Sequence, residues 1–263
     1  MSTSYTLGIV KRYAVVVAFM VGIIGGTGLV FADTLLPVNL VSYWKFNEHS
    51  GDAVDSVGSN TLYNTTGVTY AHGVLRRAAY LVGTSSEYFS NSSPSGLNSN
   101  TDFSVNSWVY LDTLPSLNAE YDLVSIWNGN PSDRAWLIGL DNSSGSQMLD
   151  FATGDGSTAA GGLVSWSPAT STWYMITLVY THATHQAQFY VNGVAQGSPI
   201  TGLTDINTSI AASLGVGNRV SGNIFTYLDG RVDETGYWTR DLSQWNIRHL
   251  YNHGYGMSYP FSY

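Results

Sequence analysis

Hydrophobic and polar residues alternate in short runs along most of the chain after residue 33, and glycine, asparagine and serine separate the runs. Alternate residues of an extended strand share a face. In residues 103–111 one face therefore receives Phe103, Val105, Val109 and Leu111, and the other receives Trp108 and Tyr110. Similar runs predict further strands over residues 41–46, 122–127, 135–140, 148–152, 173–181, 186–191, 194–196, 213–216 and 225–237.

Two tight reversals and one helix complete the pattern. Residues 182–185 join two predicted strands as a hairpin turn, and Asn192-Gly193 favours the positive φ angles of a type I′ turn. Near the end of the chain Ser243 can cap a helix that Gly254 terminates, with a one-sided apolar stripe formed by Ile247, Leu250 and Tyr251. Many short strands and a single short helix predict an all-β antiparallel sandwich.

The first 32 residues have a different pattern. A polar start ends in Lys11-Arg12, and 20 uncharged residues follow before Asp33. This layout is typical of a secretory signal peptide, and an uncleaved membrane anchor is the competing interpretation. Both place everything after Asp33 outside the cytoplasm, so we expect a secreted or cell-surface protein. The predicted organisation is a leader at 1–32, one domain at 33–254 and an aromatic tail at 255–263.

Composition narrows the function classes. The chain has 18 acidic and 10 basic residues and a net charge of −8, which disfavours nucleic acid as a partner. It contains no cysteine, so disulfides, iron–sulfur clusters, zinc fingers and thiol nucleophiles are excluded. We expect contact with a membrane only through the N-terminal segment, if that segment is not cleaved.

Five motifs occur in the order of a known family. They are LVSYWKFNE at 40–48 with DSVG at 55–58, FSVNSWV at 103–109, the hairpin formed by 173–180 and 189–193, LDGRVDE at 228–234, and the helix at 242–252. Together they resemble the LamG-like jelly rolls of the concanavalin A-like lectin/glucanase superfamily. The resemblance implies a jelly-roll β-sandwich, and it assigns Trp44, Trp108 and Trp173 to the core.

The resemblance also implies one structural Ca²⁺ where the first and last strands meet. On the matching positions Asp55 and Asp233 supply carboxylates, and Glu48 assists. Calcium takes six to eight oxygen ligands, so backbone carbonyls would complete the shell. The alternative is that these acids cap turns and pair with Arg231 or Arg76.

Catalytic motifs are missing. Glu120-Tyr121-Asp122 begins the paired-carboxylate pattern of the glucanases, but Ser125 and Ile126 occupy the places of its second glutamate. Asp233 and Glu234 are adjacent, so we expect them to point to opposite faces of a strand. No Gly-x-Ser-x-Gly elbow is present. We therefore predict a non-catalytic protein, and a glycoside hydrolase of the same fold is kept as an alternative.

Carbohydrate binding requires aromatic rings with polar groups around them. The stretch from 127 to 136 offers both, through Trp127, Asn128, Asn130, Asp133, Arg134 and Trp136. The alternative is that both tryptophans are core residues at strand ends. We predict an exported module that binds a glycan or glycoprotein. The rival is a structural or adhesive surface protein that associates with itself through the tail at 255–263, unless that tail packs on its own domain.

Two histidine pairs remain. His182 and His185 flank the predicted hairpin turn, where they either hold a metal with a third partner or stay solvated. His249 and His253 have zinc-compatible spacing on the terminal helix, but we interpret them as residues favoured by the helix dipole.

Overall fold

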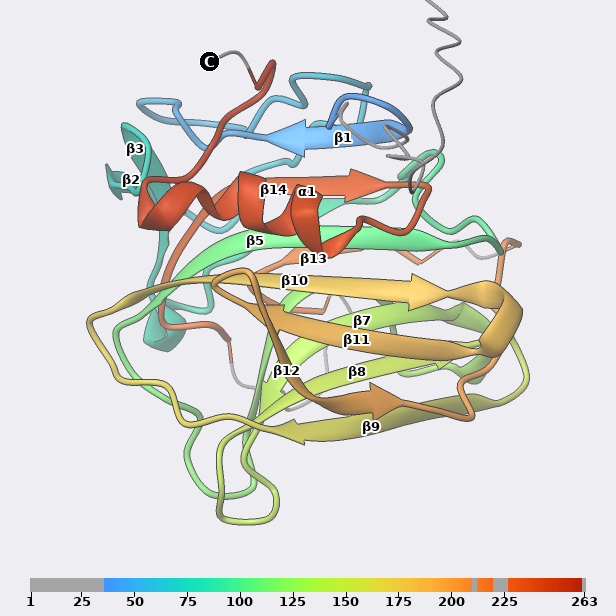
Figure 1. Cartoon of the computed structure of the whole chain (residues 1–263). Helices are drawn as coiled ribbons and strands as arrows, with labels where there is room; N and C mark the ends of the chain where they lie inside the picture. Colours follow the sequence, from blue (N-terminus) through green and yellow to red (C-terminus); the bar gives the residue numbers. More distant parts are fainter. Residues whose placement is uncertain (1–35, 210–211, 220–226, 262–263) are drawn as a thin grey trace, which may run out of the picture. The chain divides into compact units, whose positions relative to one another are not determined.

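The computed structural model describes residues 36–209, 212–219 and 227–261. The predicted leader lies outside these residues, so the signal or anchor helix stays a prediction. Residues 36–261, with those gaps, form a sandwich of two antiparallel sheets with one short α-helix (Figure 1). Among the described helices, none is long and apolar enough to span a lipid bilayer.

The larger sheet has eight strands: β1 (Leu40–Trp44), β2 (Thr69–His72), β3 (Arg77–Leu81), β5 (Phe103–Leu111), β10 (Trp173–Thr181), β11 (Gln186–Val191), β12 (Val194–Ile200) and β14 (Gly230–Trp238). Its order is β12-β11-β10-β5-β14-β3-β2, and β1 pairs with β14. The predicted strands over 103–111, 173–181 and 186–191 are confirmed with their bounds. Asn192 and Gly193 have φ angles of 52° and 79°, as the predicted turn requires.

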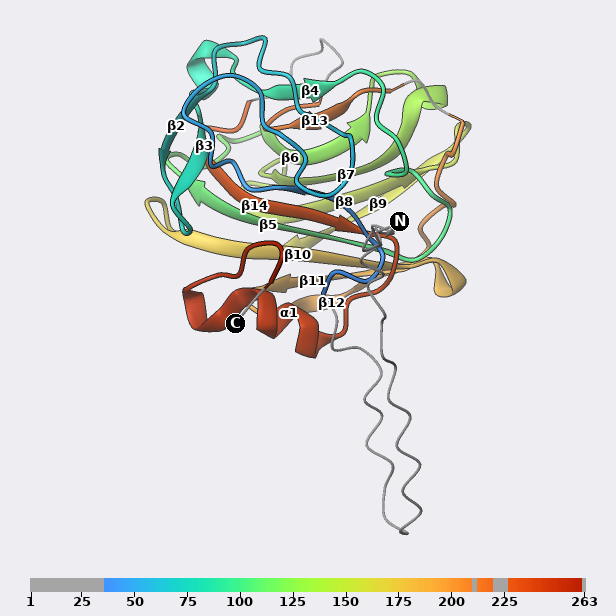
Figure 2. The ribbon, with the colours of Figure 1, turned by 90° about the horizontal axis from the view of Figure 1, so that it is seen from above.

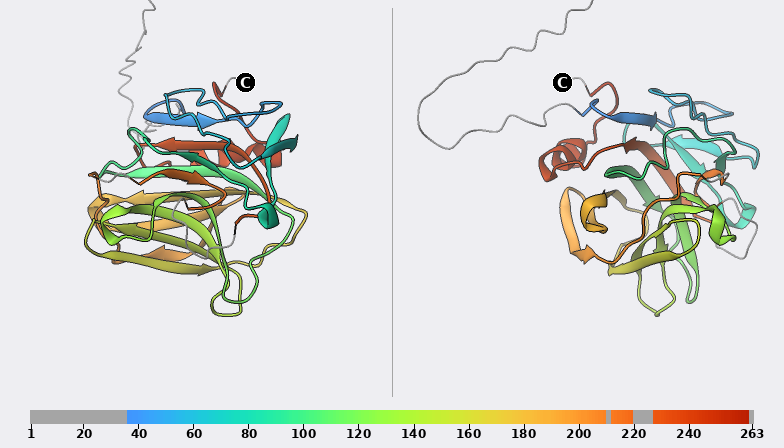
Figure 3. Two further views of the ribbon diagram at one scale, coloured as in Figure 1. Left: turned by 180° about the vertical axis from the view of Figure 1, so that it is seen from behind. Right: turned by 90° about the vertical axis from the view of Figure 1, so that its right-hand side faces the viewer.

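The second sheet has six strands: β4 (Phe89–Asn91), β6 (Glu120–Trp127), β7 (Arg134–Asp141), β8 (Met148–Gly154), β9 (Ala159–Ser165) and β13 (Leu214–Val216). Its order is β4-β13-β6-β7-β8-β9. In the view from above, this sheet lies in the upper part of the picture, beside β14, β5, β10 and β11 (Figure 2), and the two layers are also visible from the side (Figure 3).

The main core lies between the two sheets. Trp136 of the smaller sheet stacks on Tyr237 of the larger one, with ring centroids 5.7 Å apart. Tyr237 in turn stacks on Phe103 at 5.5 Å. Because apolar residues of both sheets alternate into this layer, the sequence pattern of period two is explained by burial.

A second, smaller core covers the outer face of the larger sheet. Helix α1 (Gln244–Tyr251) and the C-terminal tail pack there. Trp108 stacks on Tyr251 at 5.7 Å, and Tyr43 contacts the edge of Phe261 at 5.4 Å. In Figure 2 the helix lies on the side of the larger sheet opposite to the smaller one. The described part of the tail therefore packs on its own domain.

The short helix begins where the sequence indicates and ends earlier than expected. The Ser243 side chain accepts a hydrogen bond from the backbone N–H of Asn246, which caps the helix. Asn252 adopts a left-handed conformation with a φ of 46° and ends the helix two residues before Gly254. Four short 3₁₀ turns complete the described elements: η1 (Gly83–Ser85), η2 (Pro131–Asp133), η3 (His182–Thr184) and η4 (Asn252–Gly254).

Candidate functional site

A pocket of about 570 Å³ lies between the residues that follow β1, the turn between β2 and β3, the middle of β14 and the C-terminal tail. Ligand sites in proteins commonly have volumes of about 300–1,000 Å³. The pocket combines charged groups, amides, a hydroxyl, an aromatic ring and apolar side chains. Its lining consists of Lys45, Asn47, Leu75, Arg76, Glu234, Asn252, Gly256, Met257, Ser258, Tyr259 and Pro260.

Glu234 reaches the pocket through an irregularity of β14. The register with β5 shifts between Asp233 and Gly236, and Glu234 has a φ of 45°, which is unusual for a residue other than glycine. This bulge breaks the alternation on which we based the expectation that Asp233 and Glu234 point to opposite faces. That expectation is wrong, because both carboxylates approach the turn at residues 73–76.

Burial dominates the electrostatics of this acid pair. Glu234 is fully buried, and its burial raises its pKa to about 7, although the Tyr43 and Ser258 hydroxyls and the Lys45 and Arg76 charges act in the opposite direction. Burial also raises the pKa of Asp233 well above its usual range, followed in importance by the charge of Glu234. Both carboxyl groups therefore carry less negative charge at neutral pH than exposed acids do.

The rim of the pocket is cationic and aromatic. The Lys45 ammonium lies 5.8 Å from the centre of the Tyr259 ring, and that ring contacts Tyr43 at 6.2 Å. Asn252 donates to the carbonyl of Gly256 at 3.0 Å, which fixes the tail where it turns along the pocket. The lining thus combines ammonium, guanidinium, amide and hydroxyl donors with one aromatic ring, and this combination suits a polyhydroxylated ligand.

The two tryptophans of the predicted carbohydrate loop are buried. Trp136 is 1% exposed, its indole N–H donates to the carbonyl of Leu97 at 2.7 Å, and it belongs to the main core. Trp127 is 7% exposed, and the guanidinium of Arg134 lies over its ring at 5.3 Å. The burial of both side chains agrees with the alternative interpretation, core residues at strand ends.

The polar residues of that loop mainly bind one another. The Asn128 amide donates to Asp133 at 2.9 Å, and the backbone N–H of Asn130 donates to the Asn128 side chain at 2.8 Å. The Arg134 guanidinium donates to the carbonyl of Gly129 at 3.0 Å. These bonds give the loop a defined shape, and they leave Asn130 exposed to solvent.

An aromatic row that the sequence did not indicate crosses the outer face of the larger sheet. Register places Tyr80 opposite Arg231, Arg231 opposite Tyr110, and Tyr110 opposite Trp173. The guanidinium lies 5.5 Å from the Tyr80 ring and 4.8 Å from the Tyr110 ring, and the Tyr110 and Trp173 centroids are 5.4 Å apart. All four side chains are half-exposed, so Trp173 is less buried than the resemblance implied.

Asp55, a predicted calcium ligand, has its carboxylate filled by backbone donors. Its Oδ1 accepts the N–H groups of Tyr43, Val57 and Gly58, each at 3.0 Å. Its Oδ2 accepts the N–H of Asn60 at 3.0 Å. This is the turn-capping role that we kept as the alternative, and donors aimed at both oxygens leave little room for a cation.

The other two predicted calcium ligands each have one buried oxygen that finds no hydrogen-bond partner in the described part of the chain. These atoms are Oε2 of Glu48 and Oδ1 of Asp233. Within the described residues, Glu48, Asp55 and Asp233 do not form a group whose ligand atoms all lie within 4.8 Å of one another. The three acids therefore do not fit a shared calcium site in this arrangement, and calcium binding stays a prediction.

The Glu120–Asp122 pair lies in a polar cluster on the smaller sheet. Arg219 binds both acids, with 2.6 Å to Glu120 and 2.9 Å to Oδ1 of Asp122. Burial raises the pKa of the neighbouring Asp150 to about 7, with further contributions from Glu120, Asp122 and Asp141. Ser125, at one place of the missing second glutamate, is fully buried. The cluster therefore gathers several carboxylates around one arginine on the smaller sheet.

Several solved structures share this fold at low sequence identity. The binding domain of the Paraclostridial mosquitocidal protein 1 aligns with a TM-score of 0.65, 18% identity, 82% of this chain and 52% of its own length. Domain 4 of an extracellular arabinanase from Geobacillus stearothermophilus, in complex with arabinotriose, aligns with a TM-score of 0.59 and 21% identity. The alignment covers 80% of this chain and 97% of the arabinanase domain.

The receptor-binding domain of botulinum neurotoxin type G aligns with a TM-score of 0.60 and 15% identity, over 82% of this chain and 51% of its own length. This chain thus spans about half the length of the toxin binding domains. A comparison with curated protein sequences gives no match. The family comparison matches residues 83–248. The chain therefore belongs to the Laminin G family of the concanavalin A-like lectin/glucanase superfamily.

Proposed function

We propose that this chain is an exported, non-catalytic carbohydrate-binding module, and that the pocket around Glu234 is its saccharide site. The observation that carries the proposal is the lining of the pocket. The ring of Tyr259 offers an apolar face, and Lys45, Arg76, Asn47 and Ser258 offer donors for hydroxyl groups. A sugar presents the same two kinds of surface.

The similar structures support the proposal to different degrees. The arabinanase domain is matched over 97% of its length, so its extent corresponds to that of the matched part of this chain. That domain was solved in complex with arabinotriose. A botulinum neurotoxin serotype D binding domain was solved in complex with N-acetylneuraminic acid, but this chain covers 51% of it. We therefore favour an oligosaccharide ligand and leave the identity of its sugars to experiment.

The test is a glycan array with the full chain, followed by calorimetric titration with the strongest saccharide. We expect saturable binding with one site per chain. Tyr259→Ala and Lys45→Gln each remove a part of the rim, and each should weaken binding by at least about tenfold, or about 1.4 kcal/mol. Trp245→Ala is the matched control, because Trp245 is an exposed aromatic residue on α1 that does not line the pocket.

Three outcomes would count against the proposal. The first is an array without signal. The second is binding that both pocket variants retain and that Tyr110→Ala, in the aromatic row, removes. The third is assembly of the chain into multimers without saccharide binding, which would favour the rival function of a structural or adhesive surface protein.

The acid cluster on the smaller sheet keeps the hydrolase alternative open. Asp150, with a pKa of about 7, is the group that would donate a proton there. The arginine that binds Glu120 and Asp122 occupies both acids and opposes a role as free nucleophile or base. Release of reducing sugar by the full chain, abolished by Asp150→Asn, would support the hydrolase and contradict the non-catalytic proposal.

A further inference from the structure

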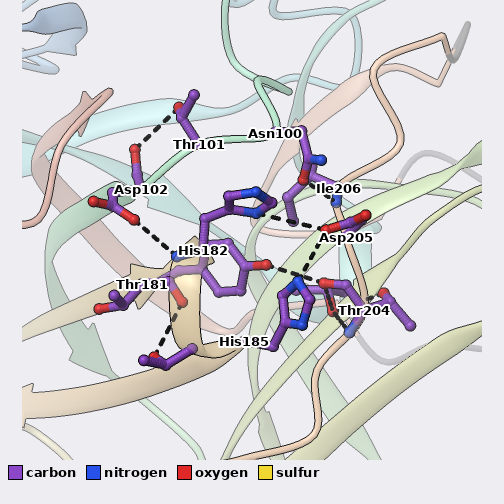
Figure 4. Close-up of polar contacts among 12 residues, drawn as sticks. Asn100, Thr101, Asp102, Thr181, His182, His185, Thr204, Asp205 and Ile206 are labelled. Atoms are coloured by element: carbon purple, nitrogen blue, oxygen red, sulfur yellow. Dashed lines mark hydrogen bonds and ion pairs between the residues drawn. The ribbon is translucent and has the colours of Figure 1, made fainter.

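A cluster of two imidazoles and a carboxylate lies outside the pocket, the acid cluster and the aromatic row. His182 and His185 belong to the turn between β10 and β11, and Asp205 comes from the segment between β12 and β13. Figure 4 shows both rings directed toward the Asp205 carboxylate. The sequence raised the possibility that this histidine pair holds a metal with a third partner, and the fold supplies that partner from 20 residues further along.

The ligand atoms are already close to one another. Oδ1 of Asp205 lies 3.0 Å from Nε2 of His185 and 3.6 Å from Nδ1 of His182. All three ligand atoms lie within 4.8 Å of one another. Within the described part of the chain, no other group of three or more histidine, aspartate or glutamate side chains meets this limit. Ligands of a tetrahedral zinc ion are about 3.4 Å apart, given bonds of about 2.0–2.2 Å. Small side-chain adjustments would therefore place all three on one ion.

The backbone on both sides of the cluster is fixed by hydrogen bonds. The N–H of His182 donates to Asp102 at 2.8 Å, and the N–H of Leu203 donates to the carbonyl of His185 at 3.2 Å. Thr204 and Ile206, on either side of Asp205, donate to side chains of Thr153 and Asn100 at 2.9 Å each. The ligands therefore project from a rigid frame, which lowers the ordering cost of binding an ion.

The donor set selects the kind of ion. Two imidazoles and one carboxylate suit zinc and its neighbours among the divalent transition metals, whereas calcium and magnesium prefer all-oxygen shells. The three side chains are 35%, 45% and 51% exposed, so an ion can enter from solvent and keep at least one position open to water.

We propose that His182, His185 and Asp205 form a surface site for one divalent transition-metal ion of the zinc class. Such an ion would join the turn between β10 and β11 to the segment that follows β12. It would stabilise the folded chain, because a ligand that binds only the native state raises the unfolding free energy with its concentration.

The test is a zinc titration of the untagged full chain, first stripped of metal with a chelator, followed by calorimetry and thermal unfolding. We expect one site per chain and a rise in Tm of about 5–10 °C at a zinc concentration 100 times Kd. Magnesium and calcium at the same concentrations should give no rise through this site.

Variants decide whether these residues form the site. His185→Asn suits the left-handed backbone at His185, where φ is 46°, and Asp205→Asn keeps the side-chain shape. Each should weaken zinc binding by at least about 100-fold. Loss of a residue that only supports a metal ligand typically costs about 10–100-fold, and loss of a ligand itself should cost more. His49→Asn, at an exposed histidine elsewhere, should bind as the unmodified chain does. All three variants should be folded without zinc, and a Tm measured in the presence of chelator checks this.

Two results would overturn the proposal. One is an unchanged Tm and no heat of binding up to millimolar zinc. The other is zinc binding that both His185→Asn and Asp205→Asn retain in full, since the ion would then lie on other histidines of the chain.

Discussion

Two carboxylates of this protein, Asp55 and Glu234, lie in very different environments. Asp55 accepts four backbone N–H groups, whereas among the described residues neither carboxylate oxygen of the fully buried Glu234 has a partner that meets hydrogen-bond geometry. The first acid holds a turn together. The second lowers the stability of the fold when it is charged, because it is buried beside a pocket. Buried groups with perturbed pKa values are common at functional sites.

At Asp55 we predict a loss of stability that does not depend on calcium. In Asp55→Asn the amide nitrogen replaces one acceptor oxygen, so at least one backbone N–H in the turn faces a donor. We expect the unfolding free energy to fall by about 2–4 kcal/mol. Urea unfolding in calcium and in EGTA should give the same loss. A loss seen in calcium alone would instead support the calcium site predicted from the sequence.

At Glu234 we predict a reversal of the usual effect of pH. Its pKa of about 7 in the folded state lies above the ordinary value of 4.5, so the folded state disfavours the charged form. The chain therefore loses stability as pH rises from about 4.5 through about 7. Glu234→Gln removes this titration, and it should gain about 2–4 kcal/mol relative to the unmodified chain between pH 4 and pH 8.

Denaturant unfolding at a series of pH values measures this gain. Asp241→Asn, which changes an exposed carboxylate, is the control for loss of one negative charge. Parallel stability curves for Glu234→Gln and the unmodified chain from pH 4 to pH 8 would show that Glu234 keeps an ordinary pKa.

At the scale of elements, the sequence predicted strands with a strong apolar pattern and missed others. β5 and β11 alternate with period two, whereas β10 is a nearly continuous apolar run, WYMITLVYT, because both of its faces are buried. β9 (Ala159–Ser165) has the sequence AAGGLVS, with little to bury, and it forms one edge of the smaller sheet. β2 and β3 were also missed, since arginine and histidine occupy their ends.

The pocket could not be predicted from the sequence because a backbone irregularity and a tail create it. The bulge that turns Glu234 toward the pocket follows from pairing with β5, not from any local motif. The loop at 127–136 had the composition of a sugar site, but its two tryptophans are buried by sheet packing. Composition alone does not distinguish a core tryptophan from a platform.

We expect saccharide binding to depend on how the C-terminal tail packs on the domain. Phe261 is 7% exposed and contacts Tyr43 and Trp238, so it fixes the end of the segment that lines the pocket. Phe261→Ala should cost about 3 kcal/mol of stability and weaken saccharide binding by at least about tenfold. Tyr255→Ala changes a tail residue that is 74% exposed, and it should leave both unchanged. Full binding by folded Phe261→Ala would separate the tail from the site.

At the scale of the whole molecule, two cores cover opposite faces of the larger sheet. The main core between the sheets sets the fold, and the second core seats helix α1 and the tail. The pocket forms where that tail passes the middle of β14, and it gathers residues from positions 45 to 260. A site assembled over such sequence distances depends on the complete domain.

A crystal structure of the full chain with the saccharide selected by the array would show whether this pocket receives a saccharide. We predict a sugar ring against Tyr259, with hydroxyl groups within hydrogen-bond distance of Lys45 and Arg76. A saccharide bound with full occupancy on the aromatic row, on the 127–136 loop or beside Asp150, with the pocket filled by water alone, would contradict it.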